Sequence, residues 1–136
     1  MEIITEDYVS FAIAKLLKEK GFDCSCEHQY INCSSGHPFL TDIRDDAGCY
    51  YKNSEIGEDE YSAPTLQMAM KWLVQEYRRY VNVTPNVVDF YWTEKFDSYV
   101  EDLNKKYPLG KFIGTFNSTE EAANAAIKYC LEHFIK

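Results

Sequence analysis

Hydrophobic residues recur with helical spacing near the start of the chain. The apolar stripe consists of Ile13, Leu16 and Leu17, and residues three or four apart lie on one face of a helix. Ser10 precedes the stripe at an N-cap position, and Gly21 follows it where a left-handed residue ends many helices. Thr5 is a rival cap about one turn earlier. We therefore expect a first helix that starts after Ser10 or Thr5 and ends at Gly21.

A second segment with helical spacing covers Thr65–Val81, with Thr65 or Ser62 as its cap. One face carries Leu66, Ala69, Met70, Leu73 and Tyr77. Met68 and Trp72 point in nearly the opposite direction, so this helix is apolar on two sides. Either other elements cover both sides, or Met68 and Trp72 form an exposed patch that binds a partner.

The last segment with helical spacing is Ser118–Ile135. Its stripe consists of Ala123, Ala126, Ile127, Cys130 and Phe134, with Leu131 at the edge. Ser118 and Glu121 have the spacing of a capping box, in which each side chain accepts a hydrogen bond from the other's backbone N–H. We expect His133, near the end of the helix, to interact with the C-terminal carbonyls.

Strand-forming residues cluster elsewhere. Short strands are expected at 27–32 and 48–52, and longer ones at 87–92 and 111–116. The acidic stretch at 58–60 is typical of a solvated loop. Residues 96–103 match the helical template, but their short length and the turn at 93–95 favour a hairpin strand over 97–103. The fold class that results is α+β, an antiparallel β-meander with about three helices packed mainly on one face, in a single domain of residues 1–136.

Composition narrows the classes of function. The chain of 136 residues has 22 acidic and 14 basic residues, a net charge of -8 and a pI near 4.8. Nucleic-acid binding needs a basic surface, so we expect no nucleic-acid partner. No apolar run is long enough for a membrane span, and the first residues do not resemble a signal peptide. An acidic surface that imitates DNA is a weaker interpretation, because no long acidic run exists.

The five cysteines and three histidines carry the main candidate chemistry. An odd number of cysteines without a secretion signal indicates reduced thiols in a cytoplasm. Cys24, Cys26, Cys33 and His37, with His28 close by, offer the nitrogen and sulfur ligands of a zinc site. Their spacing does not match the usual C-x2-C pairs, so inert thiols are the simpler interpretation.

The sequence contains no motif of a known reaction. Cys33 or Cys26 with His28 or His37 as a base would make a thiol nucleophile, but no flanking signature accompanies them. Asp42, Asp45 and Asp46 lack the order of a calcium loop. Phosphate-cradling glycine loops are absent, and glycine is scarce at six residues. We therefore expect no enzyme activity and no cofactor.

Several strings of the sequence resemble one family. They are Lys15-Leu16-Leu17-Lys18-Glu19-Lys20-Gly21-Phe22, Tyr51-Lys52-Asn53-Ser54-Glu55, Ala63-Pro64-Thr65-Leu66-Gln67-Met68-Ala69-Met70-Lys71-Trp72-Leu73 and Ala126-Ile127-Lys128-Tyr129-Cys130-Leu131. In this order they are similar to a family of small uncharacterised proteins from phages, prophages and mobile elements of gut Bacteroides-type bacteria. The resemblance implies a bacterial cytoplasm, an accessory role and a strand before the last helix. It implies no catalytic, metal or cofactor site, and the cysteine and histidine cluster is not part of it.

The hypothesis that follows is a small acidic protein that works by contact with a protein partner or with itself. Aromatic side chains are abundant, with eleven Tyr, eight Phe and two Trp, and aromatic residues are enriched in interfaces. Phe11, Met68 and Trp72 are the candidate contact residues. The alternatives are a zinc-stabilised module built on Cys24, Cys26, Cys33 and His37, and an inhibitor of a host protein.

Overall fold

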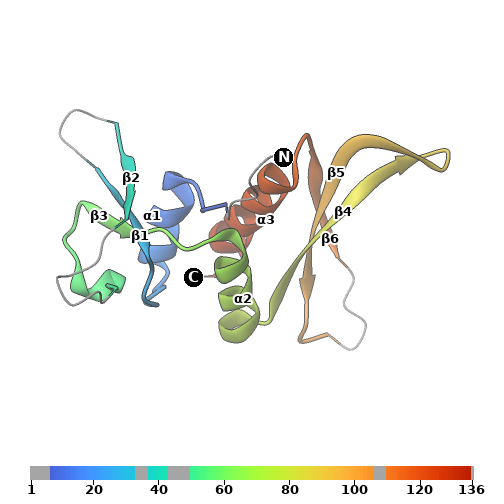
Figure 1. Cartoon of the computed structure of the whole chain (residues 1–136). Coiled ribbons are helices and arrows are strands. Elements are labelled where there is room, and N and C mark those ends of the chain that lie inside the picture. The colour runs from blue at the N-terminus through green and yellow to red at the C-terminus, as the bar shows by residue number, and fades with distance from the viewer. Residues whose placement is uncertain (1–6, 33–36, 43–49, 106–109, 136) are drawn as a thin grey trace. The chain divides into compact units, whose positions relative to one another are not determined.

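The computed structural model describes residues 7–32, 37–42, 50–105 and 110–135. Contacts within the chain divide it into two compact units, Met1–Thr65 and Leu66–Lys136, where the sequence analysis expected a single domain. Each unit has its own three-stranded antiparallel sheet (Figure 1). The predicted α+β class is confirmed.

The first unit combines one α-helix with a small sheet. Its elements are α1 (Phe11–Glu19), β1 (His28–Ile31), β2 (Phe39–Asp42), the 3-10 helix η1 (Asn53–Glu55) and β3 (Glu60–Ser62). The strand order is β2-β1-β3, so the first strand in the sequence is the central one. Helix α1 packs against β3. The hydroxyl of Tyr30 on β1 also donates a hydrogen bond to the Val9 carbonyl at 2.6 Å, which links the sheet to the segment before α1.

The ends of α1 follow the sequence prediction. The Ser10 hydroxyl accepts a hydrogen bond from the Ile13 amide at 3.4 Å, so Ser10 and not Thr5 is the cap. Gly21 has φ +93°, the left-handed conformation that glycine adopts without steric cost. The buried face is turned slightly from the predicted stripe, because Ala14 is buried and Leu16 is only half-buried.

A buried asparagine connects the loops of the first unit. The side chain of Asn53 is 5% exposed. Its amide nitrogen donates to the Phe22 carbonyl at 2.8 Å, and its amide oxygen accepts from the Ser62 backbone N–H at 2.9 Å. One side chain therefore satisfies a backbone group just after α1 and another at the end of β3, as buried polar groups require.

The strand predictions for the first unit are partly confirmed. The strand expected at 27–32 is β1. Of the strand expected at 48–52, residues 48–49 lie outside the described residues, and Tyr51 forms only an isolated bridge with Cys26. Strands β2 and β3 were missed, and Glu60 begins β3 instead of ending a solvated loop. These strands have three or four residues, too few for a period of two to be recognised.

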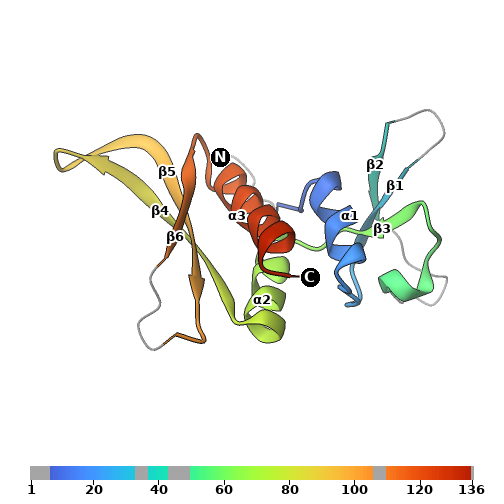
Figure 2. The same ribbon diagram turned by 180° about the vertical axis from the view of Figure 1, so that it is seen from behind.

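The second unit is a meander covered by helices. Its elements are α2 (Leu66–Tyr77), β4 (Arg79–Val88), β5 (Tyr91–Asp102), β6 (Lys111–Phe116) and α3 (Thr119–His133). The strand order β4-β5-β6 is the predicted antiparallel meander. Helix α3 packs on all three strands, and α2 packs on β4 and α3. Both helices lie on the same side of this sheet (Figures 1 and 2).

Helix α2 is shorter than the sequence analysis predicted. It begins directly after Thr65 and ends at Tyr77, whereas the prediction extended it to Val81. Arg78 has φ +57°, which stops the helix, and Val81 belongs to β4. The alternative cap Ser62 is the last residue of β3. The predicted C-terminal end of this helix is wrong because a valine such as Val81 fits the apolar stripe of a helix as well as it fits a strand.

Helix α3 confirms half of its predicted capping box. The Ser118 hydroxyl accepts from the Glu121 amide at 3.1 Å, while the Glu121 carboxylate accepts from the Asn117 amide instead of the Ser118 amide. His133 Nδ1 lies 3.1 Å from the Tyr129 carbonyl, as expected for a histidine in the last turn. Phe134, predicted in the core stripe, is 38% exposed, because the helix ends one residue before it.

The conflict at 96–103 is resolved in favour of a strand. Strand β5 runs to Asp102, and its Ser98 hydroxyl, fully buried, donates to the Ala122 carbonyl of α3 at 2.8 Å. The strand at 111–116 is confirmed as β6. The strand expected at 87–92 is wrong, because the chain reverses direction inside it, at Asp89 and Phe90.

Candidate functional site

The three contact residues proposed from the sequence do not form one exposed patch. Trp72 is 8% exposed and packs edge-to-face with Tyr77, at 5.2 Å between ring centroids. Of the two alternatives for the second apolar side of α2, the covered side is therefore confirmed at Trp72, and the exposed patch is wrong there. Met68 is half-buried. Phe11 belongs to the other unit and is half-buried between the rings of Tyr30 and Tyr61.

The predicted zinc ligands are not gathered in the described part of the chain. Cys24 is half-buried, Cys26 is buried and His37 is exposed, while Cys33 lies outside the described residues. Among the residues that are described, no three His, Cys, Asp or Glu side chains lie close enough to hold a metal ion. The four-ligand set stays a prediction. Asp42 ends β2, and Asp45 and Asp46 also lie outside the described residues.

The buried thiols are poorly suited to nucleophilic chemistry. Burial raises the pKa of Cys26 to about 12, with the neighbouring Cys24 as a smaller cause. Burial also raises the pKa of Cys130 to about 12, against the opposing influence of Arg79. The thiolate is the reactive form of cysteine, so at neutral pH both groups are almost entirely in the unreactive form. His28, a candidate base for Cys26, has a buried Nδ1 without a hydrogen-bond partner and packs against Tyr8.

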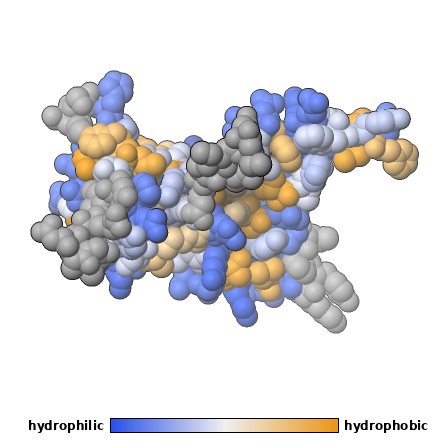
Figure 3. Space-filling model, viewed as in Figure 1, coloured by the Kyte–Doolittle hydropathy of each residue, from blue (hydrophilic) through white to orange (hydrophobic). Residues whose placement is uncertain are grey.

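The most exposed apolar side chains of the described residues lie at the tip of the β4–β5 hairpin. They are Val87 at 54%, Val88 at 56%, Phe90 at 100%, Tyr91 at 78% and Trp92 at 54% exposed. We call these five residues the hairpin tip. Figure 3 shows apolar side chains at the end of the projecting hairpin. Single exposed apolar residues are ordinary, but five within six positions form a patch typical of an interaction site.

The hairpin tip extends beyond the rest of its sheet. Strand β6 pairs with β5 only between Phe96 and Val100, so Tyr91 and Trp92 pair with β4 alone, and the residues 93–95 lie in the irregular part of the β4–β5 pairing. The last part of the hairpin is therefore a two-stranded ribbon, which Figure 1 shows projecting from the sheet. Isolated two-stranded ribbons are only marginally stable in water. Such an extension needs local interactions to hold its shape.

The turn at the end of the ribbon has an unusual residue. Val88 pairs with Tyr91, and the two residues between them, Asp89 and Phe90, have φ +51° and +70°. Positive φ at both positions is the pattern of a type I′ turn, which favours Asn-Gly or Asp-Gly. Phe90 occupies the position that glycine normally takes, at a cost of roughly 1–2 kcal/mol. A bulky ring is thus held fully in solvent by a strained backbone.

A polar network at the base of the ribbon stabilises its shape. The pairing shifts between Pro85 and Val87, where Asn86 lies opposite Thr93 to Lys95. The Asn86 amide donates to both oxygens of Asp97 at 3.1 Å, and the Thr93 hydroxyl donates to the Asn86 side-chain oxygen at 2.6 Å. The Thr115 hydroxyl of β6 donates to Asp97 at 2.6 Å. The network connects the bulge to the third strand, so the tip projects from an anchored base.

The Trp92 ring of the tip is held as well. The Trp92 indole N–H donates to the Lys95 carbonyl at 3.1 Å, across the bulge. Its ring packs edge-to-face on Phe96, with 5.7 Å between centroids. Aromatic rings with few free torsions lose little entropy on binding, which is why they dominate the energy of interfaces. The sequence analysis missed this site because it interpreted the same residues as an uninterrupted strand.

Comparisons with known proteins add no assignment. No protein-family model, no curated protein and no solved structure matches this chain. Within the described residues, no helix has the length and apolar character needed to cross a membrane.

Proposed function

We propose that the protein acts by binding another protein, with the hairpin tip as its contact element. The observation that carries this proposal is the fully exposed Phe90 on a strained turn, flanked by four further exposed apolar side chains. Strain in a backbone is a reason to look for a function at that position. A projecting apolar ribbon fits a concave, apolar site on a partner.

The distribution of charge favours a partner recognised by apolar contact. Residues 66–136 contain nine acidic and nine basic side chains, so the unit with the hairpin has no net charge. Residues 1–65 contain thirteen acidic and five basic side chains, which gives the whole net charge of -8. Asp89 lies in the turn between these tip residues, and its negative charge disfavours contact with an anionic lipid surface.

A different protein fits the tip better than a second copy does. Three pockets lined by described residues of this chain have mainly polar and charged side chains in their walls. They do not offer the apolar groove that Phe90 and Tyr91 require. The setting we propose is the accessory role that the resemblance to proteins of phages and mobile elements implies, in a bacterial cytoplasm.

Site-specific crosslinking tests this proposal. A photoreactive phenylalanine analogue replaces Phe90, and a second sample carries it at the exposed Lys128 of α3 as the matched control. We expect one protein of the host cell to crosslink at position 90 and not at position 128, and to bind the wild-type chain after purification. A crosslink only to a second copy of this chain, only to lipid, or equally at both positions would contradict the proposal.

A further inference from the structure

The second unit contains a small pocket where positive charges gather, at the end of the sheet where β4 and β6 begin and β5 ends. The pocket has a volume of about 90 Å3. Its lining residues are Arg79, Val100, Asp102, Lys105, Lys111 and Phe134. Three cations against one carboxylate leave a charge of +2 around the pocket, in a chain whose net charge is -8.

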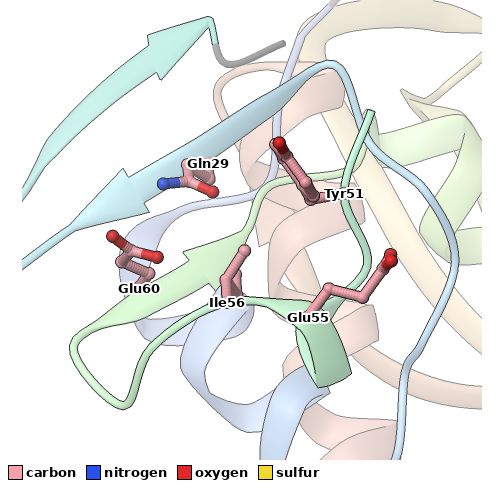
Figure 4. Close-up of a pocket in the computed structure, with 5 residues that line it drawn as sticks. All are labelled: Gln29, Tyr51, Glu55, Ile56 and Glu60. Carbon is pink, nitrogen blue, oxygen red and sulfur yellow. The ribbon is translucent and has the colours of Figure 1, made fainter. Parts of the chain in front are cut away.

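The larger pocket of the first unit has the opposite character. Its volume is about 330 Å3, and its charged side chains are the carboxylates of Glu55 and Glu60, which Figure 4 shows on opposite sides. Like charges at short range repel each other, so this pocket disfavours an anion. The pocket of the second unit is therefore the place in the described chain where an anion is attracted.

Arg79 uses only part of its capacity to donate hydrogen bonds. Its Nη1 donates to Asp102 at 2.6 Å, whereas its Nε is buried without a hydrogen-bond partner in the described part of the chain. Nη2, on the same edge of the guanidinium as the Nε–H, has no partner there either and is not fully buried. Such an edge matches two oxygens of one oxyanion. Because a buried donor without an acceptor is costly, this edge points to a ligand that supplies one.

The guanidinium is held in place before any ligand binds. Arg79 and Asp102 lie opposite each other in the pairing of β4 with β5. The Asp102 oxygen that accepts from Arg79 also accepts from the Asn104 backbone N–H at 3.0 Å, which fixes the carboxylate. The Phe134 ring covers one face of the guanidinium, with 5.0 Å from Cζ to the ring centroid. A site that is ordered in advance loses less entropy when a ligand binds.

Lys105 and Lys111 supply the positive charge that is not compensated. Lys105 follows β5, and Lys111 begins β6, where it pairs with Val100. Both lysines are exposed, and neither forms an ion pair within the described residues. Since Asp102 already neutralises Arg79, the two lysines match a ligand with two negative charges. A phosphate monoester carries roughly -1.5 to -2 at pH 7, whereas a carboxylate carries a single charge.

The size of the pocket limits the ligand to one anionic group. Its 90 Å3 have room for about three water molecules at about 30 Å3 each. A single phosphoryl group fits this space, and a nucleoside does not. A nucleic-acid strand would need a basic surface along several phosphates, which a chain with a net charge of -8 does not offer.

We propose that this pocket binds a phosphoryl group in its doubly charged form. Its oxygens accept from the Nη2 edge of Arg79 and from the ammonium groups of Lys105 and Lys111. Val100 and Phe134 form the apolar walls beside it. Free phosphate and the phosphate of a phosphorylated side chain both present this chemistry. The proposal does not depend on the function of the hairpin tip.

Nuclear magnetic resonance titration of the full chain at constant ionic strength tests this proposal. The probes are inorganic phosphate, a short peptide with one phosphoserine and the same peptide without the phosphate. The test variant is Lys105→Gln/Lys111→Gln. The control is Lys71→Gln/Lys128→Gln, two exposed lysines of α2 and α3 outside the pocket, with the same change in net charge.

We expect a phosphate probe to shift the backbone amide signals of Arg79 and Lys111 in the wild type. The test variant should weaken this binding at least about tenfold and the control less than about twofold, because charge-assisted hydrogen bonds act at close range and salt screens distant charges.

The outcomes separate the sources of the ligand from failure of the idea. Binding of inorganic phosphate assigns the pocket to free phosphate, and binding of the phosphopeptide alone assigns it to a phosphorylated protein segment. Equal losses in the two variants, or equal binding of the peptide without the phosphate, would overturn the proposal. Absence of binding by both phosphate probes at about 10 millimolar, on the order of the weakest specific affinities, would overturn it as well.

Discussion

Replacing Phe90 with glycine should stabilise the protein and weaken its complex with the partner. Glycine adopts φ +70° without strain, so the free energy of unfolding should rise by roughly 0.5–1 kcal/mol. The fully exposed ring makes no contact that folding needs. Removing an aromatic anchor typically costs about 2 kcal/mol of binding, so we expect a loss of affinity of about thirtyfold.

The control for this prediction is Asp89→Gly. It introduces glycine at the neighbouring turn position, which also has positive φ, and keeps the aromatic ring. Its affinity should stay within about threefold of the wild type, a change of under 1 kcal/mol. Denaturant unfolding measures the stability of each variant. Calorimetric titration with the purified partner, the protein identified by crosslinking at position 90, measures its affinity. Equal affinities for Phe90→Gly and the wild type would exclude the ring from the interface.

Replacing Asn53 with alanine should strongly destabilise the first unit. The change leaves the Phe22 carbonyl and the Ser62 backbone N–H buried without partners, and it opens a small cavity. Two unsatisfied buried groups cost about 2–4 kcal/mol in total. Denaturant unfolding monitored by circular dichroism measures this loss.

Ser54→Ala is the matched control for Asn53→Ala. Ser54 is exposed and donates only to the exposed carboxylate of Asp23, at 2.9 Å. Its backbone N–H also donates to Asp23, and these two hydrogen bonds lower the pKa of that carboxyl. The backbone bond survives the substitution, so we expect a loss below about 1 kcal/mol. Similar losses for the two variants would show that Asn53 does not hold the loops together.

The sequence predicted the elements with strong local signals. Ser10, Gly21 and Ser118 have the roles that their positions suggested, because caps and left-handed residues depend on local backbone chemistry. The strand at 97–103 was also predicted, although the helical period fits the same residues. Ser98 explains why these residues form a strand and not a helix. Its fully buried hydroxyl hydrogen-bonds to α3, which is a tertiary contact and not a local one.

The hairpin tip was not predicted from the sequence. The turn at Asp89 and Phe90 lacks the glycine that normally marks a type I′ turn, so Val87–Trp92 had the composition of one continuous strand.

The accessibility of Trp92 tests the central claim most directly. Trp92 is 54% exposed at the tip and Trp72 is 8% exposed on α2, so the variants Trp72→Phe and Trp92→Phe leave one reporter each. In the free protein, acrylamide should quench the fluorescence of Trp92 strongly and that of Trp72 weakly. Saturation with the purified partner that crosslinking identified should protect Trp92 from acrylamide. The quenching of Trp72 should stay unchanged. A Trp92 that stays equally accessible in the saturated complex would contradict binding through the hairpin tip.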